Sequence, residues 1–279
     1  YLDPREGAKL AVAESCRNLS TVGALPVAAT NNLNFGNPER PEIMAQLVEA
    51  VEGIAEACTH FEAPITGGNV SLYNETLGEG IYPTPVLGVV GLMKTTLPVP
   101  SSFTRVGAHL VLVGGFRSTD AQRFGSSQYA KVILDQLWGL PPALDMDYEK
   151  RVHQAMREIA AAGLAESAHD LSDGGLAVAL SESCTSAVGA KITSAGGGRA
   201  EFALFGEAQS RILVSTASPE QISVILFRHG VEGGVIGVTI KERLQIEDGG
   251  KMLIDVPTQS LRESHEGALP EVLHSQHAG

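Results

Sequence analysis

At residues 25–30 the chain reads Leu-Pro-Val-Ala-Ala-Thr, and at residues 31–38 it continues Asn-Asn-Leu-Asn-Phe-Gly-Asn-Pro. The apolar run predicts a buried strand, and the short amides after it place hydrogen-bonding groups at the end of that strand. Ligands of α/β proteins usually bind at this edge of a sheet, although Asn and Gly also form turns for purely local reasons. Taken alone, the polar run slightly favours a local turn.

A second segment of the same kind is Gly67-Gly68-Asn69-Val70-Ser71, which follows the extended residues 64–66. Two glycines let a backbone approach a phosphate closely, Asn69 offers an amide oxygen to a hard cation, and Ser71 offers a hydroxyl to a substrate oxygen. A Gly-Gly pair is equally an ordinary turn. Two such segments in one unit nevertheless favour a shared site, so we predict that residues 30–38 and 67–75 together form part of a site for a phosphorylated small molecule and a hard cation.

The surrounding pattern predicts two mixed units. Helical spacing predicts helices at 7–22 and for about five turns from Pro41, and an apolar run predicts a strand at 85–93, which together give an α/β layer with helices on one sheet face. Leu-Pro-Val-Pro-Ser-Ser at residues 97–102 predicts a domain boundary. Beyond it we expect strands at 108–113, 168–170, 210–215, 235–239 and 252–254, and helices at 126–137, 148–162, 176–183 and 219–229.

A third candidate segment reads His-Asp-Leu-Ser-Asp-Gly-Gly at residues 169–175. Asp170 and Asp173 precede a predicted helix, where carboxylates can hold a cation while phosphates meet the helix N–H groups. Asp173 could equally be an ordinary N-cap, and His169 is better read as a structural residue than as an acid–base group. Further along, Glu207 and Arg211 are expected to form a structural ion pair.

Composition excludes several classes of function. The chain has 32 acidic and 20 basic side chains, a formal charge of -12, which argues against a nucleic-acid binder. The three cysteines form no CxxC pair, and Cys16 and Cys58 fall on apolar helix faces, where buried, inert thiols are expected. No apolar run reaches the ~20 residues that span a bilayer, so a membrane protein is not indicated and a cytoplasmic location is expected.

Longer phrases resemble a known family. Among them are Leu33–Glu39, Gly67–Glu75, Asp170–Gly175 and the spaced residues Phe205-Gly206-Glu207 with Ser210-Arg211. Together with the opening Tyr1-Leu2-Asp3-Pro4, they resemble the second half of the phosphoribosylformylglycinamidine synthase family, within the AIR synthase-related superfamily. The resemblance covers residues 1 to about 260.

This resemblance implies an AIR synthase-like unit of α/β and α+β class. An N-terminal α/β half-barrel domain (residues 1–100) would contribute strands to a barrel with its counterpart, followed by a C-terminal α+β domain (106–265) and a flexible tail (266–279). The family uses ATP, Mg²⁺ and ammonia to convert formylglycinamide ribonucleotide to formylglycinamidine ribonucleotide in purine biosynthesis. Its partners would be the first half of the synthetase, a glutaminase subunit and a small accessory subunit.

Carried over by motif, Asn31 and Gly68 would contact ATP, Asn69 would be a Mg²⁺ ligand, and Ser71 would contact the ribonucleotide. Glu75, Asp170 and Asp173 are further nucleotide or metal candidates. The family usually has Asp where this chain has Asn31, which weakens one charged contact. The family's catalytic histidines belong to the first half, so no catalytic residue is expected here and the isolated chain should be inactive.

The family's first strand is also missing from this sequence, which reads as a fragment or split subunit whose open sheet edge could support a homodimer. Two alternatives stay open. The chain could be a related small-molecule kinase or synthetase of the superfamily, because the phrase at 170–175 is shared widely. It could also be a structural module that binds ADP or ATP without catalysis.

Overall fold

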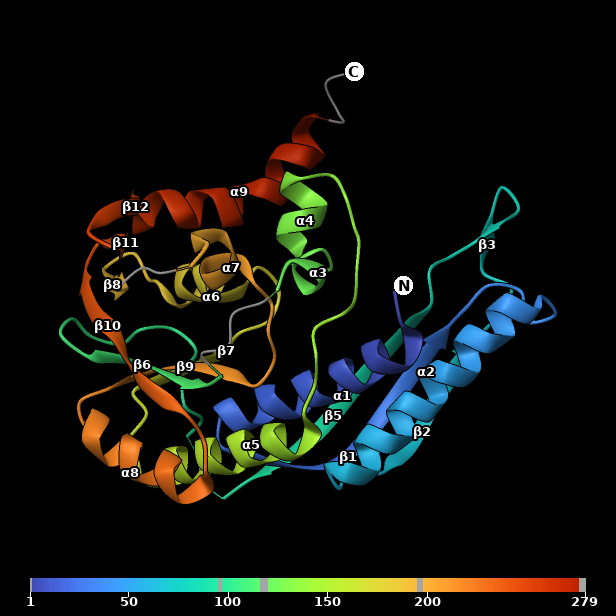
Figure 1. The fold of residues 1–279 in the computed structure, drawn as a ribbon, viewed down its shortest axis with the longest axis horizontal. Helices are drawn as coiled ribbons and strands as arrows, with labels where there is room; N and C mark the ends of the chain where they lie inside the picture. Colours follow the sequence, from blue (N-terminus) through green and yellow to red (C-terminus); the bar gives the residue numbers. More distant parts are fainter. Residues whose placement is uncertain (1, 95–96, 116–119, 195–197, 276–279) are drawn as a thin grey trace.

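The structure is a computed structural model, and it describes all residues except 1, 95–96, 116–119, 195–197 and 276–279. Two sheets organise the chain (Figure 1). The first has three strands and comes from residues 24–93, whereas the second has seven strands and comes from residues 109–257. Among the described residues, none of the helices has both the length and the apolar character needed to cross a membrane.

The first sheet has the strand order β2–β1–β5, with β1 at Ala24–Asn34, β2 at Ile65–Ser71 and β5 at Thr84–Met93. β1 pairs with β2 in parallel and with β5 antiparallel. Between β2 and β5 lies a small hairpin formed by β3 (Glu75–Thr76) and β4 (Glu79–Gly80). The predicted strands at 25–30 and 85–93 are confirmed, but β1 continues four residues beyond Thr30, through the polar run.

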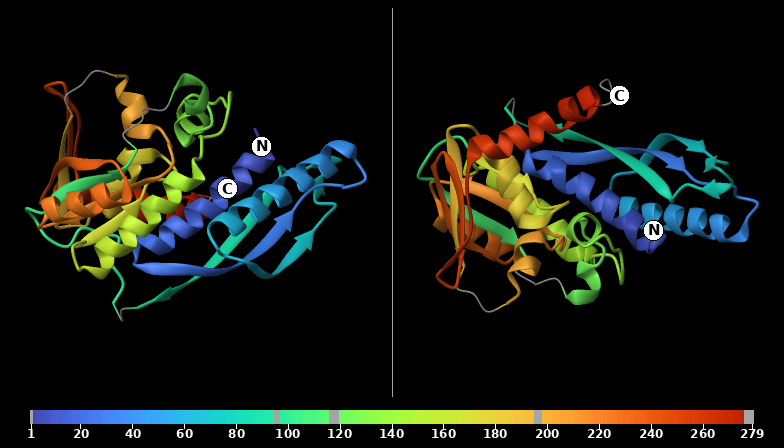
Figure 2. Two further views of the ribbon diagram at one scale, coloured as in Figure 1. Left: turned by 60° about the horizontal axis from the view of Figure 1, so that its bottom comes forward. Right: turned by 90° about the horizontal axis from the view of Figure 1, so that it is seen from above.

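Helices α1 (Pro4–Thr21) and α2 (Pro41–His60) cover one face of this sheet (Figure 2). Each begins with a proline in its first turn, where the missing N–H costs no helical hydrogen bond, and Asp3 additionally caps α1 by accepting from the N–H of Glu6. Ala29 and Leu33 of β1 pack against Val12 and Ile54 of the helices in one buried cluster. The predicted helices at 7–22 and from Pro41, with one covered sheet face, are therefore confirmed.

The opposite face of the first sheet is open. Its apolar side chains are Leu25 on β1 and Val86, Val90 and Leu92 on β5, which are 48%, 51%, 59% and 63% exposed. In Figure 2 (left), α1 and α2 lie on one side of the strands and the other side is bare. A contiguous apolar surface of this kind marks an interaction site more often than a solvated face.

The second sheet has the strand order β12–β11–β8–β10–β6–β9–β7. Its strands are β6 (His109–Gly114), β7 (Ser167–Asp170), β8 (Val188–Ser194), β9 (Arg211–Thr216), β10 (Gly233–Lys241), β11 (Arg243–Asp248) and β12 (Lys251–Pro257). The helices around it are α3 (Ala121–Phe124), α4 (Gln128–Ile133), α5 (Met146–Ala161), α6 (Gly175–Ser183), α7 (Ala200–Phe205), α8 (Pro219–His229) and α9 (Thr258–Ser275). One buried cluster packs α6 against this sheet, and a second packs α5 and α8 against it.

Three details differ from the expectations for this unit. The helix predicted at 126–137 is only α4, because Asp135 adopts a positive φ of 53° that ends helical geometry. The strands β8 and β11 were not predicted. The tail expected to lack regular structure after Pro270 is helical as far as Ser275, where Leu269, Val272 and Leu273 recur at helical spacing; residues 276–279 lie outside the described residues.

All three cysteines are buried free thiols. Burial raises the pKa of both Cys16 and Cys184 to about 12, which keeps these thiols protonated and poorly nucleophilic. The inert, structural role predicted for Cys16 and Cys58 agrees with this environment.

The two units are joined by a buried ionic network centred on Arg17 of α1, which has no exposed surface. Its guanidinium donates to Glu149 Oε1 of α5 at 2.6 Å and to Gln209 Oε1 at 3.2 Å. Glu149 Oε1 is also 2.7 Å from Nε2 of His153, and Glu149 Oε2 accepts the hydroxyl proton of Ser210. Every charge in this network is desolvated, so its stability depends on each partner being present.

Replacing Arg17 by Met should destabilise the protein strongly, because it leaves the carboxylate of Glu149 buried without its main cation. We expect a loss of about 3–5 kcal/mol in the free energy of unfolding, measured by urea denaturation. Arg228→Met removes an exposed ion pair with Glu158 on the second unit and serves as the control. Equal losses in both variants would contradict the central role of Arg17.

The network also predicts acid sensitivity. Burial alone would raise the pKa of Glu149, but Arg17 and then His153 outweigh it and lower the pKa to about 2. A carboxyl with a lower pKa in the folded state stabilises the fold above its unfolded pKa, and this contribution is lost as the pH falls through the folded pKa. Burial lowers the pKa of His153, which acts in the same direction.

The free energy of unfolding should therefore fall as the pH is lowered from about 4.5 to about 2, and protonation of Glu149 should contribute to this fall. Glu149→Gln should be less stable at pH 7 and should show a shallower decline over this range in denaturation experiments at a series of pH values. An unchanged slope would mean that Glu149 is not held ionised by the network.

Candidate functional site

The two predicted site segments lie side by side in neighbouring strands. In the parallel pairing of β1 with β2, Asn31 is opposite Gly68, Asn32 is opposite Asn69, and Asn34 is opposite Ser71. The expectation that each segment follows a strand is wrong for residues 31–34 and 67–71, which are part of β1 and β2 themselves, whereas residues 35–38 do follow β1. Their proximity is real, and it arises from backbone pairing rather than from loops that meet at a sheet edge.

Strand alternation divides these residues between the two faces of the sheet. Asn31 shares its face with Ala29 and Leu33, which pack against the helices. Asn32 and Asn34 point to the open face, and so do their neighbours on β2, Asn69 and Ser71. The candidate ATP contacts Asn31 and Gly68 are therefore on the helix side, whereas the candidate metal and substrate contacts are on the open side.

Gly68 is required by the close approach of Asn31. A Cβ on Gly68 would lie 2.0 Å from Asn31 Oδ1 and 2.7 Å from the carbonyl oxygen of Asn31. The adjacent Gly67 has nothing within 4 Å of the same position. The two glycines of the pair thus differ: one is needed for packing of the strands, and the other is not.

Asn69 is oriented by a neighbouring amide. Its Nδ2 donates to Asn32 Oδ1 at 3.0 Å, which leaves the Asn69 amide oxygen available on the open face. An amide oxygen is a suitable ligand for a hard cation such as Mg²⁺, which commonly completes its shell with water and substrate phosphates. In the part of the chain that the structure describes, no three His, Cys, Asp or Glu side chains are grouped to hold a metal. The residues therefore fit one ligand of a shared Mg²⁺ site rather than a complete site.

Ser71 is held in place by Asn74, a residue that sequence reasoning did not single out. The Ser71 hydroxyl donates to Asn74 Oδ1 at 3.2 Å, and Asn74 Nδ2 donates to the carbonyl oxygens of Ser71 and Phe35 at 2.8 and 3.1 Å. Asn74 therefore ties the end of β2 to the end of β1. Glu75 is exposed on the β3–β4 hairpin and pairs in register with Gly80.

The third candidate segment, residues 169–175, does not lie on the first sheet with the other two. Asp170 is buried at the end of β7, with Oδ2 at 3.8 Å from Nε of Arg17, so it belongs to the network between the units. Asp173 is exposed and accepts from Gln128 Nε2 at 3.2 Å. The N-cap of α6 is Gly174, so the interpretation of Asp173 as an N-cap is wrong. Among the described residues, no hydrogen bond or ion pair joins Asp170 or Asp173 to β1 or β2.

Glu207 also differs from the expectation. The predicted ion pair between Glu207 and Arg211 is wrong, because Arg211 donates to the carbonyl oxygens of Ala208 and Gly206. Glu207 instead accepts the backbone N–H groups of Gln128 and Gly174 at 2.7 and 2.8 Å, and burial raises its pKa. The Glu207 carboxylate thus connects its own loop to the starts of α4 and α6. Sequence spacing does not reveal this role, because the donors are backbone N–H groups.

Comparisons with known proteins bear on this architecture. Residues 1–93 match the family described as AIR synthase related protein, N-terminal domain, and residues 105–249 match the corresponding C-terminal domain. The chain is similar to phosphoribosylformylglycinamidine synthase subunit PurL of Caldanaerobacter subterraneus, with 41% identity over 273 residues. The match covers 96% of this chain and 37% of that relative. PurL of Moorella thermoacetica is also 41% identical, over 98% of this chain and 37% of its own length.

Solved structures share the fold. Thermotoga maritima PurL complexed with FGAR superimposes with a TM-score of 0.74 at 23% identity, covering 93% of this chain and 43% of that chain. The same protein complexed with ATP gives a TM-score of 0.70 at 23% identity, covering 92% and 41%. The chain spans about two fifths of these proteins, and in both of its parts it belongs to the AIR synthase related protein family.

Proposed function

We propose that this chain forms part of the ATP-dependent synthetase that converts formylglycinamide ribonucleotide to formylglycinamidine ribonucleotide in purine biosynthesis. The observation that carries the proposal is the 41% identity to PurL subunits over nearly the whole chain. It is supported by the polar strand ends of β1 and β2, which present amide and hydroxyl groups on an open sheet face.

In this reaction ATP phosphorylates the amide oxygen of the ribonucleotide. Ammonia then attacks the carbon that bears this oxygen and expels phosphate. The phosphate ester is a far better leaving group than an oxide, and Mg²⁺ neutralises charge on the phosphates. In our proposal the Asn31 side chain, whose close packing requires Gly68, contacts the nucleotide. The Asn69 oxygen is one cation ligand, and the Ser71 hydroxyl, fixed by Asn74, binds the ribonucleotide.

The open face of the first sheet is the proposed contact with the counterpart unit of the synthetase. Burying Leu25, Val86, Val90 and Leu92 there would remove their exposed apolar surface from water and complete the site around Asn69 and Ser71. A second copy of this chain could occupy the same face. The solved structure of PurLQS from Thermotoga maritima supports the presence of further subunits, among which we place an ammonia-producing glutaminase. All are proposed to act in the cytoplasm.

Gly68→Ala should weaken binding of Mg-ATP to the assembled protein, because the new methyl group would displace Asn31. Overpacking of this kind typically costs about 1–3 kcal/mol, so we expect roughly a five- to hundredfold loss of affinity in calorimetry if the displaced side chain contacts the nucleotide. Gly67→Ala is the matched control and should change the affinity by less than about twofold. Equal effects would show that Asn31 and Gly68 are not at a nucleotide site.

The proposed activity is tested by complementation. The chain is mixed with a polypeptide that carries the remainder of a PurL relative, and ATP- and ammonia-dependent product is measured. We expect turnover above that of the partner alone, and Ser71→Ala should reduce it by about tenfold or more, in line with loss of a substrate hydrogen bond. No gain on mixing would overturn the proposal. Nucleotide binding with turnover that is insensitive to Ser71 would instead favour a structural nucleotide module.

A further inference from the structure

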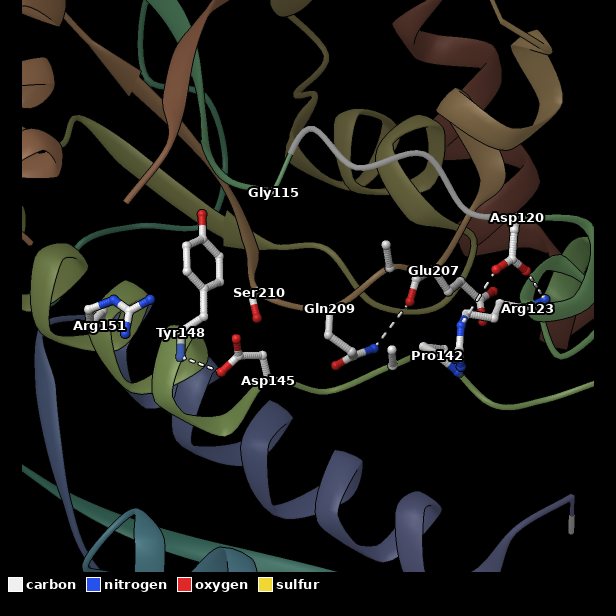
Figure 3. Close-up of a pocket in the computed structure, with 12 residues that line it drawn as sticks. Gly115, Asp120, Arg123, Pro142, Asp145, Tyr148, Arg151, Glu207, Gln209 and Ser210 are labelled. Carbon is white, nitrogen blue, oxygen red and sulfur yellow. Dashed lines mark hydrogen bonds and ion pairs between the residues drawn. The ribbon is translucent and has the colours of Figure 1, made fainter. Parts of the chain in front are cut away.

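A cavity of about 330 Å³ lies in the second unit, and none of the residues assigned to the β1–β2 site lines it. It sits between the start of α5 and the segment that leads into β9 (Figure 3). In Figure 3, Tyr148 and Arg151 stand at one end, Arg123 and Pro142 at the other, and Gln209 and Ser210 between them. Its volume falls within the range of small-molecule sites in proteins.

Arg151 lines the cavity with a positive charge that no described residue pairs with. Its guanidinium lies over the ring of Tyr148, 5.4 Å from the centroid. Among the described residues no hydrogen bond or ion pair involves Arg151. A half-buried guanidinium that is held by an aromatic ring and keeps its donors free is suited to a planar, bidentate contact with an anion.

Arg123 at the other end is partly engaged. It donates through Nη1 to the carbonyl oxygen of Pro141 at 2.7 Å, and its Nε is 3.7 Å from Asp120 Oδ2. The two ends of the cavity are therefore unequal. An anionic group is expected at Arg151, where no described residue forms a hydrogen bond or ion pair with the guanidinium.

Carboxylates along the cavity have one oxygen fixed by the backbone. Asp145 Oδ1 caps α5 by accepting from the N–H of Tyr148 at 2.9 Å, and Asp120 Oδ1 caps α3 by accepting from the N–H of Arg123 at 2.8 Å. The cap on α5 leaves Asp145 Oδ2 as an acceptor, whereas Asp120 Oδ2 lies 3.7 Å from Arg123 Nε. Such oxygens bind hydroxyl groups well, but they repel a bare anion.

The back of the cavity is already rigid. Gln209 accepts from Arg17 and donates through Nε2 to the carbonyl oxygen of Glu207, and Ser210 donates to Glu149. The buried network between the units therefore fixes this side before any ligand arrives. A preformed side lowers the entropic penalty of binding.

We propose that this cavity is a second small-molecule site, specific for a polyhydroxylated phosphate monoester of the sugar-phosphate class. The phosphate binds Arg151, and a hydroxyl group donates to Asp145 Oδ2, the oxygen that the helix cap leaves free. Both simpler ligands should bind more weakly: an uncharged sugar lacks the contact to Arg151, and inorganic phosphate lacks a carbon skeleton whose hydroxyl groups reach Asp145 while the phosphate contacts Arg151. This site is separate from the β1–β2 strand ends and does not depend on the proposed synthetase activity.

The test is calorimetric titration of the full chain with ribose 5-phosphate. Arg151→Gln should weaken binding at least tenfold, because a charge-assisted hydrogen-bonding group is lost. Arg199→Gln is the control, since Arg199 also lies over an aromatic ring, 5.0 Å from the Phe202 centroid, but it is exposed and does not line the cavity. It should leave the affinity unchanged. Circular dichroism of each variant checks that the fold is retained.

Two further arms separate this site from the first. Ser71→Ala should bind ribose 5-phosphate as the unmodified chain does, whereas Asp145→Asn should weaken it; loss of binding in Ser71→Ala would place the ligand at the β1–β2 site and overturn the inference. Ribose and inorganic phosphate should each bind at least tenfold more weakly than ribose 5-phosphate. The proposal also fails if ribose 5-phosphate does not bind, if Arg151→Gln binds it normally, or if inorganic phosphate binds equally well.

Discussion

The buried guanidinium of Arg17 is the interaction on which the arrangement of the two units depends. It extends from α1, which covers the first sheet, into the second unit, where it meets Glu149, Gln209 and Asp170. Removing such a charge from water is unfavourable by several kcal/mol, so the network is stable only with all its partners in place. Because Ser210 is bound to Glu149, the same network orders the segment before β9 and one side of the cavity beside it.

The second constraint is the parallel pairing of β1 with β2, which sets the candidate site. Pairing places Asn32 beside Asn69 and Asn34 beside Ser71, and strand alternation turns all four toward the open face. The same face carries the exposed apolar residues Leu25, Val86, Val90 and Leu92. Polar groups and an apolar surface on one bare sheet face are the expected pattern for a site that another polypeptide completes.

Much of the first unit could be predicted from sequence, because the helices at α1 and α2 have strong periodicity and proline starts, and β5 is a continuous apolar run. The closeness of residues 31–34 and 68–71 was also predicted, but for the wrong reason: polar residues within a strand resemble a turn when the pairing partner is unknown. Arg17, Glu149 and Ser210 are far apart in sequence, and nothing local indicates that they meet. Asn74 and Glu207 were likewise missed as organising residues, since several of their contacts are to backbone groups.

The central claim is that the open face of the β2–β1–β5 sheet is one side of a shared site. Hydrogen–deuterium exchange measures it directly, with the chain alone and then with the remainder of a PurL relative added. We expect slower exchange in residues 65–71 and 84–93 on mixing, a further slowing at 67–71 when Mg-ATP and the ribonucleotide are added, and no change in β11 and β12. Unchanged exchange in the first sheet, with or without protection elsewhere, would contradict it.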